Sequence, residues 1–113
     1  MNSARVNVRH SLIISTYNVR TLKGPGKLVQ LVNGCKKYNL DIVAIQEHRM
    51  KTENDVNIKV QGCYKLFYAS ANGRGQGGVA ICISQRLARS ILSINKINDR
   101  VLSITLFSSL TPN

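Results

Sequence analysis

The most informative stretch of the chain is an unbroken apolar run that ends at a carboxylate. The five residues 42–46 carry four apolar side chains without alternation, and Glu47 follows them directly. Such a run is typical of a short strand that is buried on both faces, as in a parallel sheet covered by helices. Burial does not account for the glutamate, because an ionised carboxylate leaves water only with a partner. We therefore expect a strand over residues 41–46 that ends at Glu47.

The segments before this run complete a strand–helix–strand pattern. Residues 11–17 are rich in β-branched and apolar side chains and predict a first strand. Residues 27–38 predict a helix, and Asn39 is expected to be its left-handed cap. The apolar positions of this helix follow the i, i+3, i+4, i+7 spacing of one face: Leu28, Leu31, Val32 and Cys35. The pattern predicts a βαβ unit with two parallel strands and a right-handed crossover.

The second half of the chain predicts more strands, after a polar stretch at residues 49–60 that has no strong pattern. Residues 63–69 and 78–84 are expected to be two strands joined as a hairpin. A helical turn is expected at residues 85–90 and a last strand at residues 101–107. Together these elements predict the α/β class, with one mixed sheet and one long helix. Nothing in the sequence would cover the other face of that sheet. Since a large bare apolar surface drives association, we expect the chain to be part of a larger domain or to need a partner.

A glycine-rich segment at residues 73–78 matches the spacing G-x-G-x-x-G. We reject a dinucleotide site here, because that fingerprint needs a helix directly after it and a β-rich run follows instead. The glycines are expected to form a flexible turn with Arg74 exposed at its tip.

Charge adds a partner class to this picture. The 113 residues fit at most one domain, with 16 Lys and Arg against 5 Asp and Glu, a formal net charge of +11. This imbalance predicts attraction to a polyanion, either nucleic acid or an anionic membrane. The alternative is a cationic half-surface that an acidic partner or a missing segment would balance. No apolar run is long enough to cross a bilayer. Of the two polyanions nucleic acid is the expected partner, and no membrane partner is expected.

The cysteines point to a reducing compartment. Three of them, Cys35, Cys63 and Cys82, form neither a C-x-x-C pair nor an even-numbered framework, so neither a disulfide scaffold nor a zinc site is expected. Cys35 and Cys82 stand among apolar neighbours and are expected to be small core residues. The expected location is intracellular, either nuclear or cytoplasmic.

Two oxygen-bearing side chains mark the ends of the two predicted parallel strands. Asn18 follows the first strand and Glu47 the second, and the carboxyl ends of parallel strands meet at one edge, where α/β proteins bind ligands. An amide oxygen and a carboxylate are hard ligands that suit Mg²⁺. The alternatives are that Asn18 only caps a turn and that Glu47 only pairs with Arg49 or another base.

Four short motifs in order carry a family resemblance, and they cover nearly the whole chain from residue 12 to residue 106. They are Thr16-Tyr17-Asn18-Val19-Arg20-Thr21-Leu22, Asp41-Ile42-Val43-Ala44-Ile45-Gln46-Glu47-His48-Arg49, Gly77-Gly78-Val79-Ala80-Ile81 and Asn98-Asp99-Arg100-Val101. Together they resemble the N-terminal half of the endonuclease/exonuclease/phosphatase superfamily. The branch they are most similar to is the endonuclease domain of non-LTR retrotransposons, which the proteins labelled craniofacial development protein 2-like also resemble.

This resemblance implies a fold, a cofactor and site residues. The fold would be the N-terminal half of a four-layer α/β/β/α sandwich of the DNase I-like type. The implied cofactor is Mg²⁺ or Mn²⁺ in the complete domain, with Asn18 and Glu47 as catalytic and metal-binding residues. Arg20, Arg74 and Arg100 are expected to make minor contacts with phosphate or nucleic acid.

Two departures from the family pattern bear on function. Abasic-site endonucleases carry an acidic residue where this chain has Arg20, which favours the retrotransposon-type branch. The later motifs of the family are absent from the sequence: the catalytic Tyr, the Asp-x-Asn motif and the final Asp-His pair. His10 and His48 stand at the wrong places to replace that His. We therefore expect residues 1–10 to be a flexible basic lead-in and residues 11–113 to be a partial domain without its C-terminal half.

The resemblance thus implies an N-terminal fragment of a Mg²⁺-dependent phosphodiesterase, of the retrotransposon-type DNA endonuclease kind and inactive alone. The alternatives are a non-catalytic nucleic-acid-binding remnant, which the net charge supports, a member of the phosphatase branch, and a product that does not fold alone. DNA is the expected partner, together with the missing half or a partner chain to cover the sheet.

Overall fold

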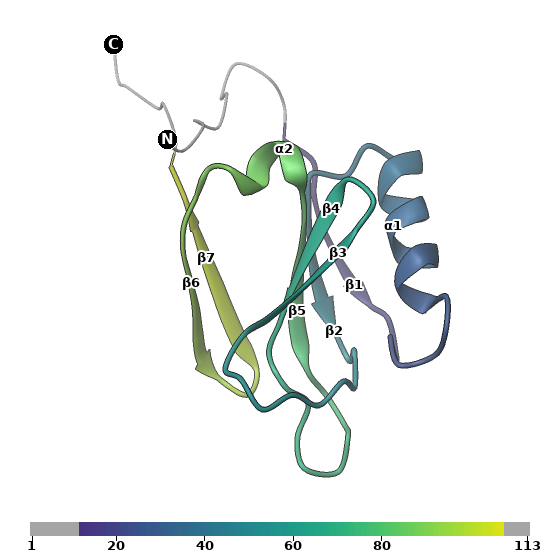
Figure 1. The fold of residues 1–113 in the computed structure, drawn as a ribbon, viewed down its shortest axis with the longest axis vertical. Coiled ribbons are helices and arrows are strands. Elements are labelled where there is room, and N and C mark those ends of the chain that lie inside the picture. The colour runs from purple at the N-terminus through teal and green to yellow at the C-terminus, as the bar shows by residue number, and fades with distance from the viewer. Residues whose placement is uncertain (1–11, 108–113) are drawn as a thin grey trace.

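Residues 12–107 are described by a computed structural model (Figure 1). Its elements are, in chain order, β1 (Ile14–Asn18), α1 (Lys27–Lys37), β2 (Ile42–Gln46), β3 (Asn57–Gln61), β4 (Tyr64–Tyr68), β5 (Val79–Ser84), α2 (Gln85–Ala88), β6 (Ile91–Asn98) and β7 (Val101–Leu106). The expected lead-in over residues 1–10 lies outside the described residues.

Seven strands form two sheets within the described residues. The first has five strands in the order β1-β2-β5-β4-β3, and the second is the β6–β7 hairpin. In the first sheet β1 and β2 are parallel, whereas β2–β5, β5–β4 and β4–β3 are antiparallel. The mixed α/β class, the parallel pair around α1 and the β4–β5 hairpin are therefore confirmed.

Helix α1 covers one face of the five-stranded sheet (Figure 1). Its buried residues, Val32 and Cys35, belong to the main core cluster. Burying one large apolar side chain of this kind stabilises the fold by about 1.5–3 kcal/mol. The helix ends as the sequence predicts, because Asn39 has a φ of 53° and the Leu40 N–H donates to the Cys35 carbonyl at 2.9 Å.

The β6–β7 hairpin packs on the other face of this sheet, so the expectation of one sheet with a bare second face is wrong. Ile94, Ile104 and Leu106 of the hairpin pack against a second core cluster formed by Phe67, Ile83 and Leu87. The sequence did not predict β6 because its pairing with β7 is irregular, with register shifts at Ile91/Ser93 and Lys96/Asn98, and such bulges break the two-residue alternation.

The cover on this second face is partial. Ile14, Ile58 and Val60 are 66%, 59% and 58% exposed, and they belong to the two edge strands, β1 and β3. Strand β3 was itself missed in the sequence, because it lies in the polar stretch after residue 49 and buries none of its residues. The expectation of uncovered apolar surface therefore holds at the two outer strands of the sheet, β1 and β3.

A buried carboxylate aligns the amino ends of β1 and β2. Asp41 Oδ2 accepts the Ile13 N–H at 2.8 Å, and Asp41 Oδ1 lies 2.5 Å from the Arg86 guanidinium nitrogen Nη2. The Asp41 carbonyl also accepts the Ser84 N–H, where β5 ends. Asp41 thereby joins the start of β1, the start of β2 and the end of β5 at the edge of the sheet opposite the candidate site.

Two of the thiols lie in the core, as the sequence predicts. Cys35 and Cys82 are free and buried in the core, and Cys63 is free and exposed. Neither α1 nor α2, the helices of the described part of the chain, has the length and apolar character needed to span a bilayer.

Candidate functional site

Strands β1 and β2 end together at what we call the carboxyl edge of the sheet. Asn18 is in register with Gln46, the residue before Glu47. The two chains stay joined past the strands, since the Val19 N–H donates to the Gln46 carbonyl at 3.0 Å. The structure therefore brings Asn18 and Glu47 to one edge of neighbouring strands, as the sequence predicts.

Asn18 lies on the face of the sheet away from α1. The register places Thr16 and Asn18 on the same face as Gln46, and the Gln46 side-chain amide donates to Thr16 Oγ1 at 3.1 Å, just beneath the edge. Asn18 Oδ1 accepts the Arg20 N–H at 3.1 Å, and Arg20 has a φ of 65°. Asn18 therefore does cap a turn, while its exposed amide oxygen keeps a second lone pair for a ligand.

Glu47 has an unusual backbone conformation and a loosely held carboxylate. Its φ is 65°, in the left-handed region that residues other than glycine rarely adopt. The Glu47 side chain is 39% exposed, and its Oε2 lies 3.7 Å from Arg49 Nε. The pair with Arg49 therefore exists, but an exposed ion pair of this length contributes little and leaves the carboxylate able to bind a metal.

Two glycines accept hydrogen bonds from the backbone that follows β2. The Glu47 N–H donates to the Gly78 carbonyl at 2.9 Å, and the Arg49 N–H donates to the Gly77 carbonyl at 2.8 Å. Gly78 has a φ of 97°, which favours glycine. Because strand β5 rather than a helix follows these glycines, the structure supports the rejection of a dinucleotide site.

His48 is the residue at this edge that the sequence did not single out, except to exclude it as the catalytic His. It is fully buried, with its ring Nε2 at 2.7 Å from the Ala69 carbonyl and its Nδ1 accepting the Met50 N–H at 2.9 Å. Burial lowers the pKa of His48 below its ordinary value of 6.5, against the opposing effect of hydrogen bonds to the Ala69 and Val79 carbonyls. The sequence signal for it is its place directly after the buried strand.

Residues 72–78 form a loop that we call the glycine loop. This loop lies at the same end of the molecule as the ends of β1 and β2 (Figure 1), and basic side chains lie beside it. Arg74 is exposed in this loop, as expected. Lys51 Nζ donates to the Gly73 carbonyl at 3.2 Å, and Lys23 Nζ lies 3.8 Å from the place of a Cβ on Gly75. Lys23 and Lys51 were not singled out in the sequence, because their convergence depends on how two loops fold.

The loop itself has an internal frame. Asn72 Oδ1 accepts the N–H groups of Arg74 and Gln76 at 2.9 and 3.0 Å, and the Asn72 N–H donates to the Gln76 carbonyl. The expected turn is therefore a hydrogen-bonded one that holds Arg74 at its tip.

Arg100 lies apart from the glycine loop in sequence but at the same end of the molecule. It belongs to the β6–β7 turn, where Asn98 Oδ1 accepts its N–H at 2.8 Å, and this turn lies at the end where β1 and β2 finish (Figure 1). The turn therefore places one more basic residue at this end, next to the acidic Asp99.

The donor set at the carboxyl edge fits a hard divalent cation. One carboxylate, Glu47, and one amide oxygen, Asn18, match Mg²⁺, which binds few protein ligands and keeps waters and phosphate oxygens. Within residues 12–107 no group of three or more His, Cys, Asp or Glu side chains could hold a metal ion.

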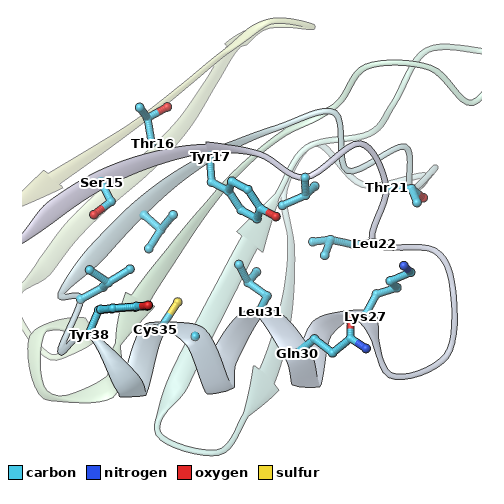
Figure 2. Close-up of a pocket in the computed structure, with 14 residues that line it drawn as sticks. Ser15, Thr16, Tyr17, Thr21, Leu22, Lys27, Gln30, Leu31, Cys35 and Tyr38 are labelled. Carbon is cyan, nitrogen blue, oxygen red and sulfur yellow. The ribbon is translucent and has the colours of Figure 1, made fainter.

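A pocket of about 440 Å³ lies between α1 and β1, away from these residues (Figure 2). Leu31 and Cys35 point into it from the helix, and Tyr17 projects from β1. Neither Asn18 nor Glu47 lines it, because alternation along β1 puts Tyr17 and Asn18 on opposite faces. The candidate site is thus an open edge rather than this pocket.

Comparison with known proteins gives the family. Residues 15–109 match the sequence model of the Endonuclease/Exonuclease/phosphatase family. The chain belongs to this family. The resemblance of the sequence motifs to this family is therefore confirmed at the level of the family, and the mixed sheet with its small second sheet is compatible with part of a DNase I-like domain.

Similar members of the endonuclease/exonuclease/phosphatase family include craniofacial development protein 2 of Bos taurus and of Tragulus javanicus. Each is 29% identical to the chain over 91 residues, which make up 80% of this chain and 15% of the relative. The chain thus spans a small part of these relatives. No solved structure matches the chain.

Proposed function

We propose that the chain supplies the N-terminal part of the metal and phosphate site of a Mg²⁺-dependent phosphodiesterase, of the retrotransposon-type DNA endonuclease kind. The observation that carries this proposal is the meeting of Asn18 and Glu47 at one edge of parallel strands. Family membership supports it, since members of this family commonly use divalent metals.

In this proposal Glu47 holds the cation and Asn18 positions either the cation or the phosphate. A bound Mg²⁺ would neutralise charge on the scissile phosphate and on the departing oxygen. The side chains of Lys23, Lys51 and Arg74 bind neighbouring phosphates and so orient the strand against Glu47. Phosphoryl transfer depends chiefly on such positioning and electrostatics.

DNA is the substrate class that fits the charges. Arg20 beside Asn18 and the cations around the glycine loop give this end of the molecule a positive potential, in a chain of net charge +11. A phosphate-rich polymer would release counterions from several such contacts at once. A phosphatase-branch substrate with a single phosphate would use fewer of them.

We infer that the 113-residue chain alone does not turn over DNA. Asn18 and Glu47 supply part of a site, and groups that act as a unit lose most of the rate when half of them are missing. The test is nicking of supercoiled plasmid by the 113-residue chain with Mg²⁺, and the expected result is background cleavage. Robust nicking that disappears in Glu47→Ala would contradict this inference.

The second candidate is a nucleic-acid-binding remnant without catalysis, favoured by the convergence of Lys23, Lys51 and Arg74 on one loop. Binding of this kind would depend on salt, persist in EDTA and survive Glu47→Ala. The two candidates separate in the complete protein, where the Glu47→Ala variant abolishes cleavage if the first is right and no cleavage exists to lose if the second is right.

A further inference from the structure

The backbone around Glu47 is held in a conformation that needs support from its surroundings. Glu47 and Arg49 have φ values of 65° and 62°, and His48 lies between them. Residues other than glycine keep such angles where the neighbouring structure fixes them, and these angles cluster at functional sites. The question is which contact fixes this turn.

The ring of His48 makes three hydrogen bonds to backbone groups of three different segments. Its Nε2 lies 2.7 Å from the Ala69 carbonyl and 3.2 Å from the Val79 carbonyl, and its Nδ1 accepts the Met50 N–H at 2.9 Å. Carbonyl groups only accept and N–H groups only donate. The neutral tautomer with hydrogen on Nε2 is therefore the one form that satisfies all three partners.

Gly78 is shaped to this ring. A Cβ on Gly78 would stand 2.5 to 2.8 Å from the Cε1, Nε2 and Nδ1 atoms of His48, a separation that real side chains do not adopt. The Gly78 carbonyl meanwhile accepts the N–H of Glu47 at 2.9 Å. The His48 ring therefore occupies the space that a side chain on residue 78 would need, and the same glycine accepts the hydrogen bond from Glu47.

From this arrangement we propose that His48, seated on Gly78, is the positioning residue for Glu47. It ties the end of β2 to the end of β4 and the start of β5, and so fixes the turn at which Glu47 leaves the sheet beside the end of β1. The assignment of Glu47 as a metal ligand rests on the proposed function, whereas the fixing of its backbone does not.

An ordinary core histidine is the competing explanation, and two substitutions separate it from positioning. In His48→Leu the space is filled but no hydrogen bond remains, whereas in His48→Gln an amide can donate to the carbonyls. Leu87→Ala is the matched control for lost stability, because Leu87 is buried in the second core cluster against the hairpin. Simple packing would favour Leu over Gln at position 48, and positioning requires the reverse.

The experiment is NMR spectroscopy of the isotope-labelled 113-residue chain, with and without Mg²⁺. Chemical shifts and intraresidue NOEs of Glu47 report its left-handed backbone, ¹⁵N shifts report the tautomer of His48, and titration of the Asn18 and Glu47 signals reports metal affinity. In His48→Leu we expect loss of the left-handed signature and about 10-fold or more weaker Mg²⁺ binding, the usual scale for residues that orient ligands. In His48→Gln and Leu87→Ala both readouts stay close to those of the unmodified chain.

The results for His48→Leu and His48→Gln decide whether His48 positions Glu47. A folded His48→Leu chain with an unchanged Glu47 backbone overturns the proposal, as does an Nδ1–H tautomer in the unmodified chain. If His48→Leu does not fold, His48→Gln decides: a retained Glu47 signature supports positioning, and its loss in a folded chain overturns it. If the unmodified chain ignores Mg²⁺ while His48→Leu loses the Glu47 signature, positioning stands and the proposed metal site falls.

Discussion

At the scale of single residues, the carboxylate of Asp41 joins three segments that are distant in the sequence. Removing it in Asp41→Ala leaves the Ile13 N–H and the Arg86 guanidinium without their acceptor, and we expect a loss of about 1–3 kcal/mol in the free energy of unfolding. Asp41→Asn keeps one acceptor and should lose less. Urea unfolding measures both variants.

The control for this prediction is Asp99→Ala. Asp99 lies 3.7 Å from Lys96 with its side chain 80% exposed, so its loss should change the free energy of unfolding by less than about 0.5 kcal/mol. Equal effects of the two alanine substitutions would show that Asp41 does not align the strands.

His48 gives a prediction about pH. Burial lowers its pKa in the folded chain below the ordinary 6.5, so the unfolded chain binds a proton at a higher pH than the folded chain does. The contribution of neutral His48 to the free energy of unfolding is therefore fully present above pH 6.5. It decreases as the pH falls below 6.5 toward the lowered pKa, with a slope of at most about 1.4 kcal/mol per pH unit. Urea unfolding in EDTA at a series of pH values measures this slope. The His48→Gln chain keeps His10, so the two chains should differ below pH 6.5, and parallel curves would refute the prediction.

At the scale of elements, the sequence was sufficient where the hydrophobic pattern is regular. The helical spacing of α1 and the buried run of β2 were predicted because burial on one stripe or on both faces leaves a clear period. From them follows the meeting of Asn18 and Glu47. Strand β3 alternates over only five residues within a polar stretch and buries none of them, and β6 contains bulges, so neither leaves the clear buried pattern of β2.

The same reasoning separates the parts of the candidate site. Asn18 and Glu47 end regular strands and could be found from spacing alone. The hydrogen bonds of His48 and the approach of Lys23 and Lys51 to the glycine loop depend on contacts between loops, which tertiary structure decides. Contacts between loops therefore escaped prediction, whereas the positions of Asn18 and Glu47 at strand ends did not.

The attachment of the β6–β7 hairpin to the sheet can be tested through Leu87. It is buried between α2, the sheet and the hairpin, so Leu87→Ala should lower the free energy of unfolding by about 2–5 kcal/mol. Hydrogen exchange should rise first in residues 91–106 if the hairpin detaches locally. The matched control is Leu92→Ala, whose side chain is exposed and should matter little; uniform exchange across the sheet would show that the hairpin does not open separately.

At the scale of the whole molecule, charge distinguishes the two ends of the five-stranded sheet, and exposed apolar residues distinguish its hairpin face. The carboxyl edge gathers Asn18, Glu47 and the cations around the glycine loop, while the opposite edge is closed by the pair of Asp41 with Arg86. Apolar edge residues remain exposed on the hairpin face. Polyanion binding should therefore be directional, at the carboxyl edge, rather than spread over a uniformly basic surface.

Salt dependence tests that direction. In Lys23→Ala/Lys51→Ala two cations beside the glycine loop are lost, and the slope of log K against log salt for duplex DNA should decrease in magnitude by about 1.8, from about 0.9 per phosphate contact. In Lys36→Ala/Lys37→Ala the same charge is lost from the last turn of α1, on the side of the molecule where Asp41 lies, and the slope should barely change. Fluorescence anisotropy in EDTA over a series of NaCl concentrations measures both. If the two variants lose equal slope, net charge alone drives binding and the carboxyl edge is not the DNA-binding surface; a larger loss in Lys23→Ala/Lys51→Ala places phosphates beside the glycine loop, at the end of the molecule where β1 and β2 finish.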